Sequence, residues 1–342
     1  MPNFASFSAQ LQATIDTLKT DLQTYMDTKT ATLIADHTAI RDHIELAIAA
    51  IAAAILIPGP VVRASFGGTA RYGAGCATYG GYVYVLGGWD GAPSYKKDMF
   101  RYYPPNNAWT TRTDFGGTAR YGHVALTAPD GIYAGLGFDG VRKKDWWTYN
   151  HAANTWAAKL DFAGTARLGA VGAYLGGLLY VGFGDDGAIK EDWYKYDPGA
   201  NTWTALASNL GHARSAGVAA AAAGKIYVGL GANVGYLTDW WEYDTAGDSW
   251  TAKATFPGAA RSLLACASDG TKIIVGGGYN GAELLDTWIY DPAADTWTQT
   301  NDLATGQRYY NSMACINHKV YAGLGRKAAA WYADWWLQQL LN

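Results

Sequence analysis

The 342-residue sequence has few charged residues and only three cysteines. Charged side chains make up 16% of the chain, and the formal net charge is −3. Because binding to nucleic-acid phosphates depends on an excess of basic residues, this balance argues against a nucleic-acid partner. The cysteines Cys76, Cys266 and Cys315 are odd in number and lack C-x-x-C spacing, so neither a disulfide framework nor a zinc site is expected. We predict inert, buried thiols in a protein made in a reducing cytoplasm.

Long hydrophobic runs and an export signal are also absent. The longest apolar run, residues 46–57, has 12 residues, whereas a helix needs about 20 to cross a bilayer. The first residues, Met-Pro-Asn-Phe, lack the basic segment that opens a secretory signal. We therefore expect no membrane insertion.

Glycine and proline are missing from residues 8–57, and Pro58-Gly59-Pro60 follows directly. This pattern predicts one long helix, with Ser8 as its N-cap and the Pro-Gly-Pro segment as its end. Apolar residues recur there at gaps of mostly four and three, as in a coiled-coil seam. The seam comprises Leu11, Ile15, Leu18, Leu22, Tyr25, Leu33, His37, Ile40, Ile44, Ile48, Ile51 and Ile55.

Residues 1–59 are thus predicted to form a helical stalk, whose helix is about 75 Å long, through which the chain associates with itself. The β-branched seam residues favour a homotrimer. A helix folded back on the rest of the chain is the alternative.

The remainder of the chain is a repeat. An arginine returns in nearly the same setting, first after 49 residues and then every 47, at Arg71, Arg120, Arg167, Arg214, Arg261 and Arg308. A tryptophan keeps the same spacing at Trp109, Trp156, Trp203, Trp250 and Trp297. Each unit contains four short strand-like segments separated by turns such as Gly176-Gly177 and Asp186-Gly187. Four antiparallel strands per unit predict a propeller blade, and six arginines predict six blades.

Three further features of the units carry a family resemblance. Two units hold paired glycines, Gly87-Gly88 and Gly276-Gly277, and the other four hold Gly-x-Gly. A tyrosine in the third strand-like segment precedes the tryptophan of the fourth, at positions 102, 149, 196, 243 and 290. On these residues, positions 60–342 resemble the kelch repeat, with a Gly-x-Gly form more like diverged bacterial or phage sequences. The resemblance implies an all-β six-bladed kelch-type β-propeller, here preceded by a long N-terminal α-helix.

The repeat count predicts how the ring closes. Six arginines are matched by only five fourth-strand tryptophans, and the segment before the first arginine, residues 60–70, aligns with residues 109–119. We therefore expect a strand at residues 61–66 to complete the last blade and remove the free sheet edges. This places the arginines on the face away from the stalk, together with the loops between second and third strands. In the doublets Trp146-Trp147, Trp240-Trp241 and Trp335-Trp336, the second member is expected to be core.

The arginines and nearby aromatic residues are the candidate ligand-binding positions. The six guanidinium groups suit carboxylates or phosphates. Their positions resemble those of arginines in kelch domains that bind acidic peptides. The alternative is a repeated ion pair with the aspartate of each unit: Asp98, Asp145, Asp192, Asp239, Asp286 and Asp334. The aromatic candidates on the same face are Tyr72, Tyr121, Tyr309, Trp89, Phe138, Tyr236, Tyr279 and Trp331.

Catalytic residues are not evident. His123 and His212 belong to blades that are not adjacent, and no histidine, cysteine and carboxylate set has metal-ligand spacing. We expect a non-enzymatic protein without a cofactor or metal. The whole chain resembles a phage fibre or spike protein, synthesised in the host cytoplasm and assembled with other virion proteins. The propeller would then recognise a host surface glycan or protein, with avidity from several copies. Two alternatives stay open: a bacterial cytoplasmic kelch module that binds an acidic partner, and a kelch-type sialic acid epimerase.

Overall fold

The computed structural model describes residues 4–29, 60–91, 94–208 and 212–338. The chain divides into two compact units, Met1–Gly59 and Pro60–Asn342. Among the described residues, no helix has both the length and the apolar character needed to cross a membrane.

The first unit contains helix α1, Phe4–Lys29. It begins four residues before Ser8, so the predicted N-cap is wrong: residues 4–7 contain neither glycine nor proline and continue the helix. The seam residues Leu11, Ile15 and Leu18 are half-buried. The rest of the predicted stalk, residues 30–57, lies outside the described residues, so the coiled coil and its trimer stay predictions.

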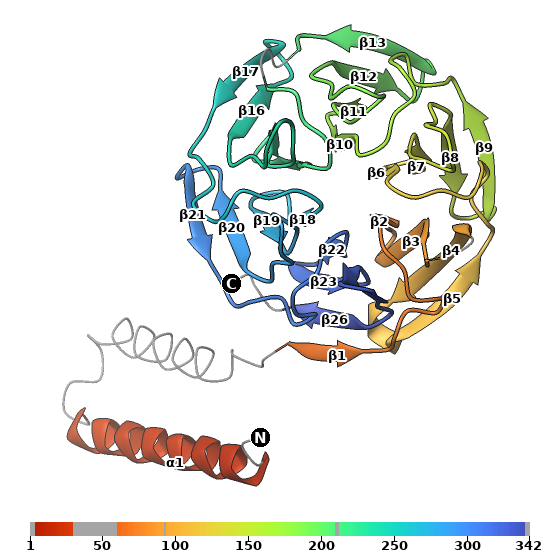
Figure 1. Cartoon of the computed structure of the whole chain (residues 1–342). Helices are drawn as coiled ribbons and strands as arrows, with labels where there is room; N and C mark the ends of the chain where they lie inside the picture. Colours follow the sequence, from red (N-terminus) through yellow and green to blue (C-terminus); the bar gives the residue numbers. More distant parts are fainter. Residues whose placement is uncertain (1–3, 30–59, 92–93, 209–211, 339–342) are drawn as a thin grey trace. The chain divides into compact units, whose positions relative to one another are not determined.

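The second unit is a ring of six four-stranded antiparallel sheets, the blades of a β-propeller (Figure 1). Blades 1 to 6, each with its strands given from the inside outward, are β2 (Gly75–Tyr79), β3 (Tyr82–Trp89), β4 (Tyr95–Tyr103) and β5 (Ala108–Arg112); β6 (Val124–Ala128), β7 (Gly131–Gly135), β8 (Trp146–Asn150) and β9 (Thr155–Lys159); β10 (Val171–Leu175), β11 (Leu178–Gly182), β12 (Trp193–Asp197) and β13 (Thr202–Leu206); β14 (Val218–Ala222), β15 (Lys225–Gly229), β16 (Trp240–Asp244) and β17 (Ser249–Ala252); β18 (Ala265–Ser268), β19 (Ile273–Gly276), β20 (Thr287–Asp291) and β21 (Thr296–Gln299); and β22 (Ser312–Ile316), β23 (Lys319–Gly323), β26 (Trp335–Gln338) and β1 (Val61–Arg63).

Blade 6 takes its outermost strand from the start of the propeller sequence. β1 pairs antiparallel with β26, with Val61 opposite Leu337 and Arg63 opposite Trp335. A hairpin of β24 (Arg326–Lys327) and β25 (Ala330–Trp331) precedes β26, and a short 3-10 helix, η1 (Pro104–Asn106), follows β4. The end of the propeller where the innermost strands begin is called the arginine face, and the opposite end is called the turn face.

Backbone hydrogen bonds join all six blades in a closed ring around the central axis. The residue two positions after each arginine donates its N–H to the equivalent carbonyl of the preceding blade at 2.6–3.2 Å, and blade 1 donates to blade 6. These central-ring residues, all with φ between 52° and 65°, are Gly73, Gly122, Gly169, Ala216, Leu263 and Tyr310. Because the ring closes on itself, none of these buried amides lacks a partner.

A second closed ring runs in the opposite direction. The glycine just after each second strand donates its N–H to the carbonyl of the next blade's arginine at 2.8–2.9 Å, from Gly88 to Arg120 and finally from Gly325 to Arg71. The neighbouring blade therefore holds the backbone of each arginine, in addition to the contacts that the arginine side chain forms.

Tryptophans fill the space between blades. Trp146 is fully buried and lies opposite Gly135 on the adjacent strand, where a Cβ would lie 2.6 Å from the indole ring. The first member of each doublet is therefore the core residue, and the expectation that the second would be core is wrong. The second members are half-buried, and the Trp147 indole N–H donates to Asp145 at 2.8 Å. Both faces of a blade are covered by neighbours, so simple alternation does not separate core from surface.

Deletion of β1 tests how much the ring depends on closure. Phe66, just after β1, is 4% exposed and packs 5.0 Å from the rings of Phe100 and Trp109. Removal of residues 1–67 deletes both β1 and Phe66; loss of the phenylalanine alone costs about 3–5 kcal/mol. We expect this variant to lose cooperative thermal unfolding in circular dichroism, whereas removal of residues 1–59 leaves the propeller transition intact. Equal melting of the two truncations would contradict this account of closure.

Candidate ligand-binding face

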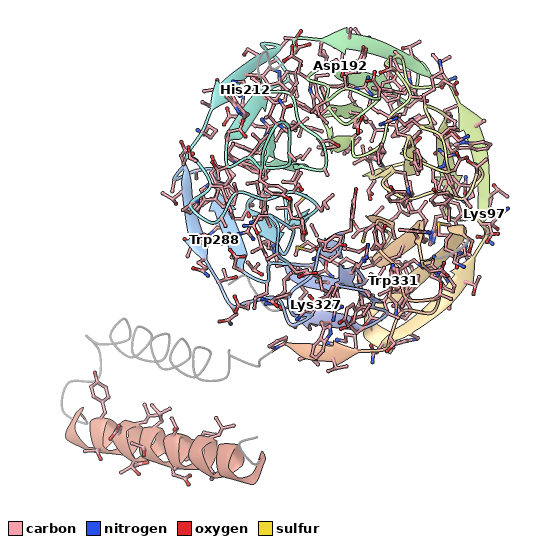
Figure 2. The ribbon with its side chains drawn as sticks, viewed as in Figure 1. Lys97, Asp192, His212, Trp288, Lys327 and Trp331 are labelled. Carbon is pink, nitrogen blue, oxygen red and sulfur yellow. The ribbon has the colours of Figure 1, made fainter. Side chains whose placement is uncertain are left out.

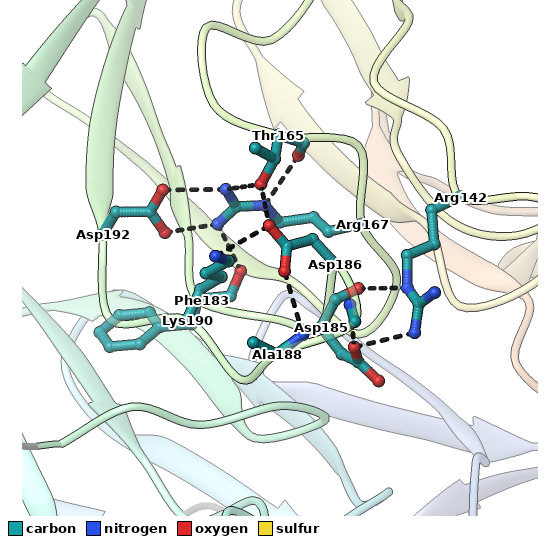
Figure 3. A network of polar contacts seen from close by, with 10 residues as sticks. Arg142, Thr165, Arg167, Phe183, Asp185, Asp186, Ala188, Lys190 and Asp192 are labelled. Atoms are coloured by element: carbon teal, nitrogen blue, oxygen red, sulfur yellow. Dashed lines mark hydrogen bonds and ion pairs between the residues drawn. The ribbon is translucent and has the colours of Figure 1, made fainter.

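Arg167 shows the local geometry of the arginine face (Figure 3). Its guanidinium group forms a two-pronged contact with Asp192 at 2.5 and 2.8 Å. The other N–H groups donate to the Phe183 carbonyl and to the carbonyl and hydroxyl of Thr165, each at 2.9 Å. A guanidinium group has five N–H donors, so all five are occupied, and the side chain is completely buried.

The same contact occurs in every blade. The arginines are 0–5% exposed, and each binds both oxygens of its aspartate. The pairs are Arg71–Asp98, Arg120–Asp145, Arg167–Asp192, Arg214–Asp239, Arg261–Asp286 and Arg308–Asp334. This is the ion-pair arrangement, and in blades 1 to 3 it leaves no guanidinium hydrogen for a ligand.

The arginine–aspartate ion pair of each blade, here called the clamp, also holds an unusual backbone conformation. One guanidinium nitrogen of each arginine donates to the carbonyl 16 residues later. In four blades that residue is not glycine but has φ between 56° and 62°: Leu136, Phe183, Leu230 and Leu324. A left-handed conformation costs such residues about 1–2 kcal/mol. Their side chains are fully buried, so core packing and the arginine hydrogen bond offset this cost.

Three of the paired aspartates, Asp145, Asp239 and Asp286, have a pKa below the usual range of an aspartate. Burial alone would raise the pKa of Asp145, but hydrogen bonds and charge from Arg120 outweigh burial and lower it, as Arg214 does for Asp239 and Arg261 for Asp286. These three aspartates are therefore charged at pH 7.

The arginine face is chemically uneven around the ring. The residue after each arginine pairs with the first residue of the loop that follows the second strand: Tyr72 with Trp89, Tyr121 with Phe138, Leu168 with Asp185, Ser215 with Ala232, Ser262 with Tyr279, and Tyr309 with Arg326. Aromatic residues thus gather in blades 5, 6, 1 and 2, and are missing at these positions from blades 3 and 4.

These aromatic residues form one contact path, the aromatic crescent, which Trp331 joins through Arg326. Its members are Tyr72, Trp89, Tyr95, Tyr121, Phe138, Tyr279, Tyr309, Tyr310 and Trp331. Ring centroids of Tyr279 and Tyr309 are 5.2 Å apart, those of Tyr72 and Tyr310 are 5.5 Å apart and stacked, and those of Tyr72 and Tyr121 are 5.8 Å apart. Trp331 lies across the ring from Asp192 of blade 3 (Figure 2).

One cation lies within the crescent. The Arg326 guanidinium is 5.9 Å from the ring centres of Tyr72 and Tyr309 and 5.5 Å from that of Trp331. Burial raises the pKa of Tyr72 to about 12 and also raises that of Tyr309, while Arg326 opposes both shifts. The tyrosines are therefore neutral hydroxyls around a permanent positive charge.

Sequence reasoning placed all eight aromatic candidates near this face but missed Tyr95, Tyr310 and Arg326. Tyr236 touches the crescent only through Tyr279, with ring centroids 6.3 Å apart, and is 39% exposed. Tyr310 was missed because its two-residue offset from Arg308 is filled by glycine, alanine or leucine in the other blades. The tyrosine at this otherwise small or aliphatic position was the feature of the sequence that could have identified Tyr310.

The central channel has a volume of about 520 Å³ and is lined by the small side chains of the innermost strands. Cys76, Cys266 and Cys315 lie in its wall, where burial raises the thiol pKa to about 12, 12 and 11, respectively. These thiols therefore stay protonated at neutral pH and are poor nucleophiles. His123 also lines the channel, and burial lowers its pKa to about 3, so it is neutral.

Comparisons with known proteins agree with the repeat geometry. A family model described as the KLHDC2/KLHL20/DRC7 Kelch-repeats domain matches residues 166–325, and the Kelch motif matches residues 70–116. The second unit is a six-bladed propeller built from kelch repeats. No curated protein matches the sequence of this kelch chain.

Comparison with solved structures supports the overall fold. One, named "Structure of YjhT", has a TM-score of 0.68 at 14% identity and covers 80% of this chain and 96% of that chain. In all, 994 chains of solved structures match, so likeness at this level identifies the fold and does not select an activity.

Substitution of a clamp arginine should mainly affect stability. Arg167→Lys keeps the charge but loses the two-pronged geometry, and we expect it to lower the free energy of unfolding by about 3 kcal/mol because hydrogen-bonding groups of the clamp lose their partner. Arg142→Lys is the matched control. Arg142 also pairs with an aspartate, Asp185 at 2.9 Å, but is half-exposed, so a change below about 1 kcal/mol is expected. Urea unfolding of both variants measures the difference; equal effects would contradict the clamp's structural role.

The clamps also predict acid sensitivity. The folded-state pKa of Asp145, Asp239 and Asp286 lies below its usual value, so their stabilisation is present above the unfolded pKa of about 4 and is lost as pH falls through the folded pKa. Urea unfolding should show a nearly constant free energy from pH 7 to about 5 and a steep fall below about 4. Asp145→Asn should be less stable at pH 7 and show a shallower acid dependence. An unchanged slope in this variant would contradict the assignment.

Proposed function

We propose that this kelch propeller is a non-catalytic recognition module that binds its partner through the aromatic crescent. The supporting observation is where the blades differ. The clamp arginine and aspartate occur in all six blades, as expected of residues that the fold requires. The position after the arginine holds tyrosine in blades 6, 1 and 2 but leucine or serine in blades 3 to 5, so the fold does not require an aromatic residue there.

The chemistry of the crescent suits a carbohydrate. Apart from the buried Tyr72, the crescent residues are half-buried. Such rings offer flat apolar faces, and the tyrosines add hydroxyl groups at their edges. Sugars present the matching combination of C–H faces and hydroxyls. Arg326 adds a charged donor among Tyr72, Tyr309 and Trp331. Kelch propellers are generally interaction modules without catalytic activity, which agrees with a binding role.

We propose further that the ligand is a glycan, or a protein that carries one, on a host cell surface, and that the chain is a virion appendage. In this proposal α1 and the following residues associate with copies of the chain or with other virion proteins. Several propellers would then bind together, and the resulting avidity compensates for weak individual sites.

The clamp geometry favours this proposal over its two alternatives. An acidic-partner module and a sialic acid epimerase both rely on arginines that are free to hold a carboxylate, whereas the repeat arginines are buried and paired. His212 is also engaged, since it lies 4.1 Å from the Trp241 ring and 3.3 Å from Asp239. Among the described residues no cluster of three potential metal ligands occurs.

A glycan array with the full chain tests the proposal. Tyr309→Ser removes a crescent ring, and we expect at least tenfold weaker binding to any glycan that the native chain retains. Leu168→Ser changes the equivalent position in blade 3, outside the crescent, and is expected to leave binding unchanged. Arg326→Ala distinguishes ligands with an acidic group, which it weakens, from neutral ones.

Two outcomes would contradict the proposal. One is the absence of any glycan binding by a folded, oligomeric chain. The other is equal loss of binding in Tyr309→Ser and Leu168→Ser, because the crescent would then have no special role.

A further inference from the structure

The turn face holds a second group of residues that depart from the repeat. It lies where blades 1 and 2 meet and is called the basic cluster: Tyr79, Tyr82, Tyr84, Arg101, Tyr103, Arg112 and His151. The His151 ring lies 5.5 Å from Tyr79, 5.6 Å from Tyr82 and 5.9 Å from Tyr84. Its Nδ1 also shares a hydrogen bond with the Tyr84 hydroxyl.

Two guanidinium groups converge on this histidine. Arg101 lies 4.4 Å above the Tyr82 ring, and its Nε donates to the Thr110 hydroxyl at 3.2 Å. Arg112 donates to the Tyr149 hydroxyl at 2.9 Å and to the His151 carbonyl at 3.2 Å. Within the described parts of the propeller, neither guanidinium forms an ion pair with a carboxylate, in contrast to the six clamp arginines.

Blade 4 carries opposite charges at the positions equivalent to Arg101 and Arg112. Arg101 and Arg112 follow Asp98 by 3 and 14 residues, and the residues at the same offsets from Asp239 are Glu242 and Lys253. Glu242 and Lys253 form an ion pair at 3.8 Å, and Glu242 accepts a hydrogen bond from the Tyr227 hydroxyl at 2.9 Å. Blade 1 therefore carries two like charges where blade 4 carries opposite charges. Two positive charges beside the same histidine are unfavourable unless a negatively charged group offsets them.

The tyrosines of the cluster also differ from the residues at the same positions in other blades. Blades 4 and 5 join the start of the second strand to the end of the third by ion pairs, Lys225–Asp244 at 2.9 Å and Lys272–Asp291 at 3.4 Å. Blade 1 has Tyr82 and Tyr103 at these places, with ring centroids 4.8 Å apart. The exchange of an ion pair for two rings removes a carboxylate and supplies an apolar surface beside Arg101.

The cluster borders a concave surface. A cavity of about 410 Å³ at the turn-face mouth of the channel is lined by Tyr79, Pro129, Tyr174 and Ile316, among others. Tyr79 forms its border with the cluster, since its hydroxyl donates to the Pro129 carbonyl at 2.9 Å and its ring lies beside His151. A ligand of one or two rings therefore has room beside Tyr79, at the border of the cluster.

We propose that the basic cluster binds an anionic group, a carboxylate or a phosphate, carried on a ring that lies against the tyrosines. Guanidinium groups hold such anions by charge-assisted hydrogen bonds, and the rings provide the contact for the ligand body. This site lies on the opposite face from the aromatic crescent and does not depend on the function proposed for it.

Burial and the nearby Arg101 and Arg112 lower the pKa of His151. The other titratable groups that face it are the hydroxyls of Tyr79, Tyr82 and Tyr84, and burial raises the pKa of Tyr84 to about 12. A bound anion offsets the two cations, so the pKa of His151 should rise on binding. This provides a readout that a purely structural cluster would not show.

Ligand-detected NMR on the full chain tests the site with three small probes. Benzoate and phenyl phosphate carry the ring and the anion, and benzyl alcohol carries the ring alone. We expect at least one anion to bind at least tenfold more tightly than benzyl alcohol, and the tighter anion identifies a carboxylate or a phosphate source. Arg101→Ala should weaken that binding about tenfold, the loss expected for one charged hydrogen bond. Lys195→Ala, which removes the basic residue at the equivalent position of blade 3, should have no effect.

The imidazole signals of His151 give a test that needs no variant of the site. Titration of the native chain with and without the bound anion should show a higher pKa for His151 in its presence. The proposal is overturned if neither anion binds more tightly than benzyl alcohol, if Arg101→Ala and Lys195→Ala bind alike, or if the pKa of His151 is unchanged at saturating anion.

Discussion

The buried ion pair between arginine and aspartate is the constraint on which the rest of the propeller depends. In each blade it ties the start of the innermost strand to the start of the third strand and to a left-handed carbonyl just after the second. The arginine carbonyl in turn accepts an N–H from the preceding blade. One residue therefore links three segments of its own blade to its neighbour, and six such residues close a ring.

Because the clamp and the two backbone rings supply the same support in every blade, other positions are free to vary. Two places use that freedom in a concentrated way. On the arginine face, aromatic residues replace serine and leucine in neighbouring blades and surround Arg326. On the turn face, Arg101 and Arg112 occupy positions that hold an ion pair in blade 4. In a repeat protein the other blades thus serve as internal references for recognising functional surfaces.

Counting residues in the sequence was enough to predict six kelch blades, because the period of 47 residues is nearly unbroken. The mismatch between six arginines and five tryptophans also predicted the closing strand at residues 61–66, of which β1 occupies Val61–Arg63. Individual side chains were harder to predict. The sequence did not reveal which tryptophan of a doublet is core, since both faces of a blade are packed. Nor did it reveal whether each arginine binds the aspartate of its own blade or a ligand, since that depends on burial and donor geometry.

Contacts between blades were the least predictable part. Tyr310 reaches Tyr72 and Tyr121 in two other blades, and His151 of blade 2 meets the tyrosines of blade 1. Such contacts join residues at different offsets in different repeats. The pattern within one repeat therefore does not predict these contacts, because the residues meet only in the assembled ring.

A double-mutant cycle on Arg167 and Asp192 tests the central claim most directly. Urea unfolding of the two single alanine variants and the double variant gives the coupling energy between the side chains. We expect a coupling of about 3 kcal/mol, because removal of Asp192 leaves the completely buried Arg167 charge unpaired. A coupling below about 0.5 kcal/mol would show that the clamp does not stabilise its blade and would contradict its central structural role.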